Sequence, residues 1–273
     1  MRQARVGLAG VFVLLSLLFS GPMPSAHAQV VVYDDFAEGF INPGKWGPSQ
    51  AGTVYELVRF ISEGHLLLGL RGYGAQRDDT GIVGSRNDLR FVQGRFSAIQ
   101  FDLGVVNYEL LGCPIAGSGL SRVIAGVHAH LFNDGSSPGP GDATGAVDAR
   151  LRIIRQSDSP LPLEALEAIG DITRCSDATC STRETLGIIS LGPVLVGQTN
   201  TFVMIWDALH NRVDFQKNAE PLASLSYTQP IASTGTARVL RVESEAANCT
   251  ASPRPFAEIT IAVDNVVVFL SPA

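Results

Sequence analysis

The sequence predicts an all-β protein, a sandwich or a barrel, and three observations lead to this. Short segments rich in valine, isoleucine, leucine and phenylalanine recur along the chain, with glycine, proline, asparagine and aspartate between them. Segments of helix-forming residues are almost absent. No internal repeat points to a propeller or a solenoid. The chain is long enough to bury one large core, so a single domain is expected over residues 29–273.

Residues 1–28 have the features of a secretion signal peptide. Arg2 and Arg5 give a positive start, an apolar run follows over residues 6–19, and Ala26-His27-Ala28 forms a small-residue cleavage site. The apolar run is short for a membrane span, which needs about 20 residues. An uncleaved anchor is the alternative. We expect a secreted protein, extracellular or periplasmic, with no membrane insertion after signal cleavage.

The strands follow one another in a regular order. A valine-rich strand is expected at residues 30–33, and a loop with Pro43-Gly44 follows it. Residues 55–61 and 65–70 are joined by the turn Glu63-Gly64, which predicts a β-hairpin. Further strands are predicted at residues 89–92, 95–106, 123–132, 147–155, 185–191, 201–206, 212–217, 237–242 and 257–269.

Two of these strands alternate clearly between their two faces, which predicts one face in the core. Over residues 123–132 the apolar face holds Val123, Ala125, Val127, Ala129 and Leu131. Over residues 147–155, Val147, Ala149, Leu151 and Ile153 oppose Asp148, Arg150 and Arg152. Residues 135–145 are rich in glycine and proline and predict an exposed loop. Residues 160–168 consist of helix formers after Pro162, and predict the one short helix of the mature chain.

The four cysteines indicate two disulfides. An even number of cysteines in an exported chain is typical of a disulfide framework, and three connectivities are possible. We favour Cys175–Cys180, which closes a local loop, and this leaves Cys113–Cys249 as a long-range bridge. A zinc site is the alternative, although no C-x-x-C pair occurs.

The charge of the chain excludes two classes of partner. The formal net charge is −6 at pH 7, and removal of the two leader arginines makes the mature chain more acidic still. No basic stripe occurs, which argues against nucleic-acid binding and against binding to anionic membrane surfaces.

Three landmarks carry a family resemblance. They are Asp34-Asp35-Phe36 with Pro43-Gly44-Lys45-Trp46, then Ile205-Trp206-Asp207 with Val213-Asp214-Phe215, and finally the segment Ile261 to Val268 around Asp264-Asn265. Together they resemble the concanavalin A-like lectin/glucanase superfamily, in its LamG-like form. The resemblance implies a two-sheet antiparallel jelly-roll sandwich in which the first strand lies beside the last. It implies little about function, because one fold hosts many activities.

Some members of that superfamily are glycoside hydrolases with an E-x-D-x-x-E signature on one strand. The nearest match is Glu243-Ser244-Glu245-Ala246-Ala247-Asn248, where the third acid is Asn248. An amide cannot act as the general acid or base. No G-x-S-x-G motif or phosphate-binding loop occurs either. We therefore expect no catalytic residues, and enzymatic activity stays an open question in which the negative answer is favoured.

The resemblance also implies a structural calcium ion where the first and last strands meet. Asp35, Asp264 and the carbonyl of Asn265 are the candidate ligands, since Ca²⁺ prefers carboxylate and carbonyl oxygens. The alternative is that Asp35 caps a turn and that Asp264-Asn265 forms a bulge. His128 and His130 have the spacing of metal ligands, but two polar residues on a wetter sheet face explain them better.

Carbohydrate binding usually needs aromatic platforms. Tyr73, in a glycine-rich loop, and Tyr108, beside Asn107 and Glu109, are the candidates, with ordinary packing as the alternative. Trp46 and Trp206 are expected in the core. Asn248-Cys249-Thr250 is also a glycosylation sequon.

The function predicted from the sequence is a secreted non-catalytic, lectin-like β-sandwich that binds a polysaccharide or a surface glycan. A divergent glycoside hydrolase is one alternative. An extracellular structural or adhesion protein without a sugar ligand is the other.

Overall fold

The computed structural model describes residues 29–92, 96–115, 117–133, 136, 139, 141–229, 233–234 and 238–270. The predicted signal peptide lies outside the described residues, and so does part of the predicted loop 135–145. Over the described ranges the chain forms strands and no helix, which confirms the all-β prediction. No helix there has the length and apolarity that a membrane crossing requires.

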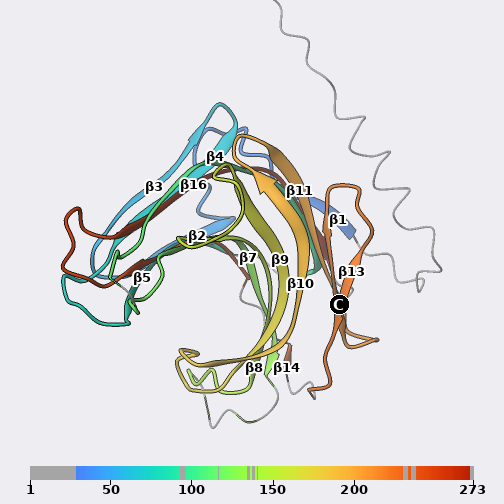
Figure 1. The fold of residues 1–273 in the computed structure, drawn as a ribbon. Helices are drawn as coiled ribbons and strands as arrows, with labels where there is room; N and C mark the ends of the chain where they lie inside the picture. The colour runs from blue at the N-terminus through green and yellow to red at the C-terminus, as the bar shows by residue number, and fades with distance from the viewer. Residues whose placement is uncertain are drawn as a thin grey trace, which may run out of the picture.

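Two antiparallel sheets pack face to face as a jelly-roll sandwich (Figure 1). The outer sheet has the order β13-β12-β11-β6-β16-β4-β3, with β1 also beside β16. The inner sheet has the order β10-β9-β8-β7-β15-β5-β2, with β14 also beside β7. Figure 1 shows the inner sheet curving so that its concave face points away from the outer sheet. The outer strands are β1 (Gln29–Asp34), β3 (Tyr55–Ser62), β4 (His65–Tyr73), β6 (Phe96–Leu111), β11 (Thr199–Asp207), β12 (Arg212–Lys217), β13 (Ala223–Ser226) and β16 (Phe256–Leu270). The inner strands are β2 (Trp46–Ala51), β5 (Ile82–Phe91), β7 (Arg122–Asn133), β8 (Ala146–Gln156), β9 (Ala165–Cys175), β10 (Arg183–Leu195), β14 (Ser233–Thr234) and β15 (Arg238–Ala247).

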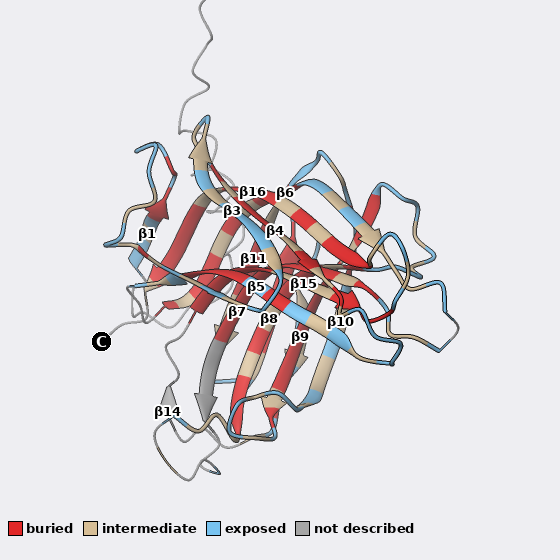
Figure 2. Cartoon of the chain, turned by 90° about the vertical axis from the view of Figure 1, so that its left-hand side faces the viewer, coloured by how far each residue is buried: buried red, intermediate tan, exposed pale blue. Residues whose placement is uncertain are grey.

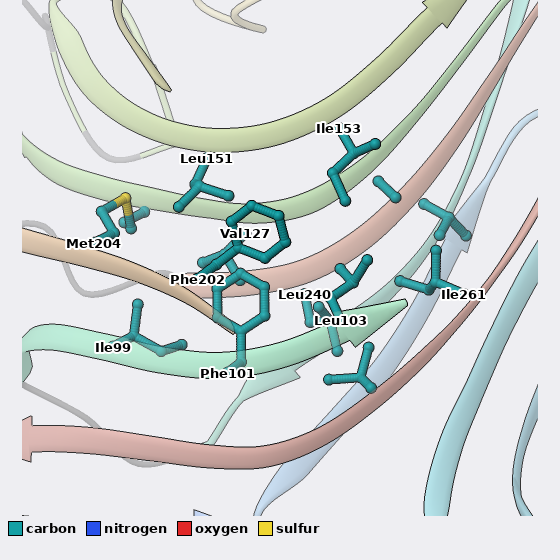
Figure 3. Packing of buried hydrophobic residues seen from close by; sticks show 14 of the residues in the cluster. Ile99, Phe101, Leu103, Val127, Leu151, Ile153, Phe202, Met204, Leu240 and Ile261 are labelled. Carbon is teal, nitrogen blue, oxygen red and sulfur yellow. The ribbon is translucent and has the colours of Figure 1, made fainter. Parts of the chain in front are cut away.

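The core lies between the sheets and follows the predicted alternation. Side chains of a strand point to opposite faces in turn, so every second residue of β7 and β8 enters the core. Figure 3 shows residues of both sheets meeting there: Ile99, Phe101, Leu103, Phe202, Met204 and Ile261 from the outer sheet, and Val127, Leu151, Ile153 and Leu240 from the inner one. The residues left over in β7 and β8 therefore lie on the concave face.

The first strand closes beside the last, as predicted. β1 pairs antiparallel with the C-terminal half of β16, while β4 pairs with its N-terminal half. The buried Asp34 fixes the loop that follows: its carboxylate accepts hydrogen bonds from Trp46 Nε1 at 2.6 Å and from the Phe36 amide at 3.0 Å. Trp46 is fully buried, which confirms its core position. Trp206 packs against the core more loosely and donates its Nε1 hydrogen to Tyr227 Oη at 2.7 Å.

Four strands, β2, β9, β13 and β14, were not predicted, and two of them have a clear local cause. The helix predicted over residues 160–168 is wrong, because residues 165–168 open strand β9. Leu166 and Ala168 are both buried in the core with a period of two, so tertiary packing overrides their helix propensity. Strand β2 was not predicted because it contains Gly47-Pro48. It is the edge strand of its sheet, where a proline is tolerated.

Both predicted disulfides form. Cys113 pairs with Cys249 across a sequence separation of 136, and Cys175 pairs with Cys180 across 5. The sulfurs of Cys175 and Cys180 approach a carboxylate oxygen of Asp148, all within 4.8 Å of one another. Because both sulfurs belong to the disulfide, this group is not a zinc site.

Candidate functional site

The concave face of the inner sheet carries a dense network of charged side chains. Residues paired across neighbouring strands share a face, so the register shows which side chains are neighbours. One row crosses the sheet as Asp88, Arg241, Gly126 and Arg152. The adjacent row crosses it as Val239, His128, Arg150 and Asp171. These rows place arginines from β15 and β8 on both sides of β7.

Arg241 is held by two carboxylates. Its Nε and Nη2 donate to the two oxygens of Asp88 at 2.7 and 2.9 Å, and its Nη1 donates to Glu243 at 2.9 Å. Asp88 is fully buried and Arg241 is 9% exposed. A bidentate arginine–carboxylate pair of this kind has a fixed geometry, so Arg241 is a rigid part of the face.

On the other side of β7, two arginines share one carboxylate. Arg150 donates from Nε at 2.9 Å and from Nη2 at 2.6 Å to Asp171, and Arg152 also donates to Asp171. Asp171 is 1% exposed. Two guanidinium groups with one shared carboxylate leave positive charge uncompensated within this group, in contrast to Arg241 with its two carboxylate partners.

Two further ion pairs extend the face toward its ends. Arg122 donates from Nε to Glu245 at 2.7 Å, and Arg183 donates from Nη1 to Asp148 at 3.0 Å. Figure 2 shows β9 in the buried colour along most of its length, although only one of its faces lies in the core. The concave face of β9 is therefore largely buried as well.

His128 lies at the centre of this network and is 8% exposed. Its Nδ1 is 3.5 Å from Arg241 Nη1, and its Nε2 is buried without a hydrogen-bond partner. Burial lowers the pKa of His128 well below its usual value, and the positive charges of Arg241, Arg150 and other nearby arginines lower it further. The imidazole is thus neutral at physiological pH, and one of its nitrogens carries no hydrogen.

Arg152 resembles His128 in having a buried atom without a partner. Its Nε is buried and makes no hydrogen bond. Burial lowers the pKa of Arg152, and the like charge of Arg150 lowers it further, while Asp171 opposes the shift. The side chain is nevertheless a cation, because an arginine is charged throughout the physiological range.

Gly126 separates Arg241 from Arg152 and has no side chain between them. Its φ of +150° is a conformation that L side chains rarely adopt, and a β-carbon there would lie 2.0 Å from the Leu151 carbonyl oxygen. Only glycine fits this position, so the row has no side chain between Arg241 and Arg152 on β7.

The two tyrosines predicted as sugar platforms lie elsewhere. Tyr73 ends β4 in the outer sheet, and its Oη donates to Glu56 at 2.7 Å. Tyr108 lies in β6, packs against the core, and donates its Oη hydrogen to the Leu163 carbonyl. Trp46 and Phe91 are the Phe and Trp residues whose side chains are described in the inner sheet, and both pack into the core. The described concave face therefore holds no aromatic platform.

The predicted calcium ligands lie near one another but keep other partners. Asp35 is exposed and caps a turn by accepting the Ala37 amide at 3.2 Å. Burial raises the pKa of Asp264, and the negative charges of Asp102 and Asp35 raise it further. Asn265 has a φ of +49° in an irregular part of β16 and donates its side-chain amide to Asp102 at 2.8 Å. These neighbours favour a cation electrostatically, and calcium binding stays a prediction.

The acidic stretch Glu243 to Asn248 is divided by the fold. Glu243 and Glu245 are on the concave face, each held by an arginine. Asn248 is fully buried instead, where its amide donates to Asp79 at 2.8 Å and its oxygen accepts the Ala75 amide at 2.8 Å. The sequon asparagine is thus an anchor for the loop after β4. His130 pairs in register with Asp148, but its side chain is outside the described residues.

The neutral state of His128 leads to a pH prediction. Its folded pKa lies well below the value of about 6.5 that the unfolded chain has, so acidification protonates only the unfolded state. The contribution of neutral His128 to the free energy of unfolding is therefore fully present above pH 6.5. It is lost as the pH falls, by up to about 2 kcal/mol between pH 7.5 and pH 5. We expect thermal melting against pH to show a flatter profile for His128→Gln, with pH 8 as the reference. Parallel profiles for the two proteins would contradict this.

The comparisons with known proteins were made for sequence and for structure. No protein-family model matches the sequence, and no curated protein matches it. Among solved structures, the chain is similar to a Bacillus licheniformis β-glucanase, with 12% identity over 91% of this chain and 100% of that one and a TM-score of 0.49. It is also similar to LamAcat from Zobellia galactanivorans (9%, 90% and 98%, TM-score 0.45). A carbohydrate recognition domain in its potassium-bound form is a further match (9%, 81% and 88%, TM-score 0.34). At these identities the likeness concerns the fold alone.

Proposed function

We propose that this protein is a secreted, non-catalytic module that binds carbohydrate on the concave face of its inner sheet. The observation that supports this most is the row of arginine and carboxylate side chains around Gly126. Sugar hydroxyl groups both donate and accept hydrogen bonds, so guanidinium donors and carboxylate acceptors suit them. The two disulfides agree with an oxidising compartment outside the cytosol.

The buried ion pairs support binding in a second way. Asp88 and Asp171 hold their arginines through bidentate contacts, so these side chains have little freedom to lose when a ligand binds. A binding face that is ordered in advance costs less conformational entropy on association.

A glycoside hydrolase is the second candidate, because Glu243 and Glu245 share the concave face of one strand. Each of them accepts a hydrogen bond from an arginine, Arg241 or Arg122. A general acid must be free to approach the glycosidic oxygen, whereas both carboxylates already have an arginine partner. The geometry therefore favours binding over hydrolysis.

The test is a glycan panel with the mature protein and two readouts, binding and release of reducing ends. We expect binding to at least one polysaccharide and no release of reducing ends. Release that disappears in Glu243→Gln with Glu245→Gln would establish the hydrolase instead. Binding to no glycan would leave a structural or adhesive role without a sugar ligand.

We also propose the structural calcium ion, with Asp35, Asp264 and the Asn265 carbonyl as its ligands. Burial raises the pKa of Asp264 most, and the negative charges of Asp102 and Asp35 raise it further; a cation would relieve this repulsion. We expect a chelator to lower the melting temperature and added calcium to restore it. Asp264→Asn should remove the response to calcium. An identical melting curve with and without chelator would overturn the proposal.

A further inference from the structure

The centre of the concave face has unpartnered polar atoms that the ion-pair network does not use. His128 Nε2 and Arg152 Nε are both buried and make no hydrogen bond. The two residues are diagonal neighbours on the concave face, because His128 pairs with Arg150 while Gly126 pairs with Arg152. Buried polar groups in folded proteins nearly always have partners, and an unsatisfied one costs about 1–3 kcal/mol. Water or a ligand must therefore supply the missing partners.

The chemistry of these atoms selects an acceptor. Arg152 Nε always carries a hydrogen and can only donate. In the neutral imidazole of His128, Nδ1 faces the guanidinium donor Arg241 Nη1 and serves as the acceptor, which places the hydrogen on Nε2. Both free atoms are thus donors, and the partner that satisfies both is an oxygen acceptor.

The charge around them selects an anion. Arg150 and Arg152 share the single carboxylate of Asp171, so these three side chains together carry one net positive charge, which the negative charge of Glu243 partly offsets. The potential at His128 is positive as well, since Arg241, Arg150, Arg152 and Arg183 all lower its pKa. This contrasts with the whole chain, whose formal net charge is −6.

We propose that this centre binds the anionic group of an acidic saccharide, a carboxylate or a sulfate ester, through His128 Nε2, Arg152 Nε and the charge that Arg150 and Arg152 share. The proposal rests on the carbohydrate-binding function above and names its substrate class. The lack of an aromatic platform among the described concave side chains agrees with recognition by charge instead of by stacking. Gly126 places no side chain between Arg241 and Arg152, and its backbone lies close against that of β8.

The experiment is calorimetric titration of the mature protein with four probes. They are an oligogalacturonate, a sulfated oligosaccharide of similar length, a neutral β-glucan oligosaccharide, and polyglutamate as a polyanion without sugar rings. We expect at least one acidic oligosaccharide to bind tenfold or more tightly than the neutral one and than polyglutamate. This affinity should fall as salt is added. The carboxylate and sulfate arms identify which anionic group is preferred.

Three variants locate the site, each checked for a native melting transition. Arg152→Met keeps the side-chain volume and should weaken acidic binding at least tenfold, with little effect on the neutral probe. His128→Gln keeps a side-chain donor and should retain more affinity than His128→Phe. Arg77→Gln is the matched control, because it removes an arginine outside the concave face, in the loop after β4, that has its own carboxylate, Asp79. It should change the affinity less than threefold.

The outcomes separate the two proposals. Equal binding of the neutral and acidic oligosaccharides would overturn the acidic class and leave the carbohydrate-binding function standing. Acidic binding that Arg152→Met does not weaken would overturn the site. Equal binding of polyglutamate would overturn the saccharide class. Binding of none of the saccharides, here and across the glycan panel, would overturn both proposals.

Discussion

Replacing both Cys113 and Cys249 by alanine is expected to lower the free energy of unfolding by about 5 kcal/mol. The bridge closes a loop with a sequence separation of 136, and the chain-entropy model gives its largest stabilisation for long loops. Cys113 follows β6 of the outer sheet and the fully buried Cys249 follows β15 of the inner sheet, so the bridge ties the two layers together at one rim. For a chain of this size, thermal melting should shift downward by about 10–20 °C.

The second disulfide is the matched control. Cys175 and Cys180 are only 5 residues apart, and the same model gives about 2 kcal/mol for a loop of this size. The double alanine variant of this pair should therefore melt well above the Cys113/Cys249 variant. Equal losses for the two variants, or a reversed order, would show that chain entropy is not what the long bridge contributes.

Asp171→Asn is expected to cost about 3–5 kcal/mol, which is typical when one partner of a buried ion pair is removed. The substitution keeps the shape of the side chain but leaves Arg150 and Arg152 without their shared carboxylate in a site where Asp171 is 1% exposed. Chemical denaturation of the wild type and the variant measures the loss. The large value arises from two cations left without compensation at a single position.

Asp207→Asn is the control for this substitution. Asp207 also has two basic partners, His210 at 2.7 Å and Arg212 at 3.4 Å, but its side chain is 20% exposed and both partners are more exposed still. Surface ion pairs contribute about 0–1 kcal/mol, so a small change is expected. Adding Arg152→Met to Asp171→Asn should recover part of the stability, because it removes one of the uncompensated charges. A loss below 1 kcal/mol for Asp171→Asn alone would mean that water reaches these guanidinium groups in the folded protein.

A charged concave face of this kind follows from the geometry of a curved sheet. The apolar half of each strand is used by the core, and the alternate half faces the concave side. In β8 this half holds Asp148, Arg150 and Arg152, which form ion pairs with Arg183 of β10 and Asp171 of β9. Opposite charges at cross-strand positions then compensate most of the desolvation, and the atoms that stay unpaired mark where a ligand is expected.

Much of the fold could be predicted from the sequence, and the misses have local causes. The alternation in β7 and β8 identified their core faces correctly. Residues 165–168 were taken for a helix because alanine, leucine and glutamate favour one, whereas Leu166 and Ala168 are buried with the period of a strand. The sequence does not predict strand β2, because Gly47-Pro48 is typical of a turn. The segment forms a strand because it lies at the edge of the sheet, where a proline is tolerated.

The candidate site was predicted only in part. Asp148, Arg150 and Arg152 were recognised as the polar face of a strand, but nothing in their own segment indicates their partners. Arg241 and Asp88 are 153 residues apart in sequence, yet Arg241 donates hydrogen bonds to both carboxylate oxygens of Asp88. Tyr73 and Tyr108 have the residue type of sugar platforms, and the pairing of β4 and β6 in the outer sheet places them off the concave face.

By itself, the sequence determined the all-β class and the presence of two disulfides, and it favoured the pairing of the cysteines and the closure of β1 beside β16 that the structure confirms. These features depend on the period of the side chains, on the number and spacing of cysteines and on motifs at the chain ends, all of which are local. The tertiary structure alone decided that β15 lies between β5 and β7, which brings Arg241 to Asp88 and to His128. The physical reason is that strand order depends on burying both sheets against each other, and this is a property of the whole chain.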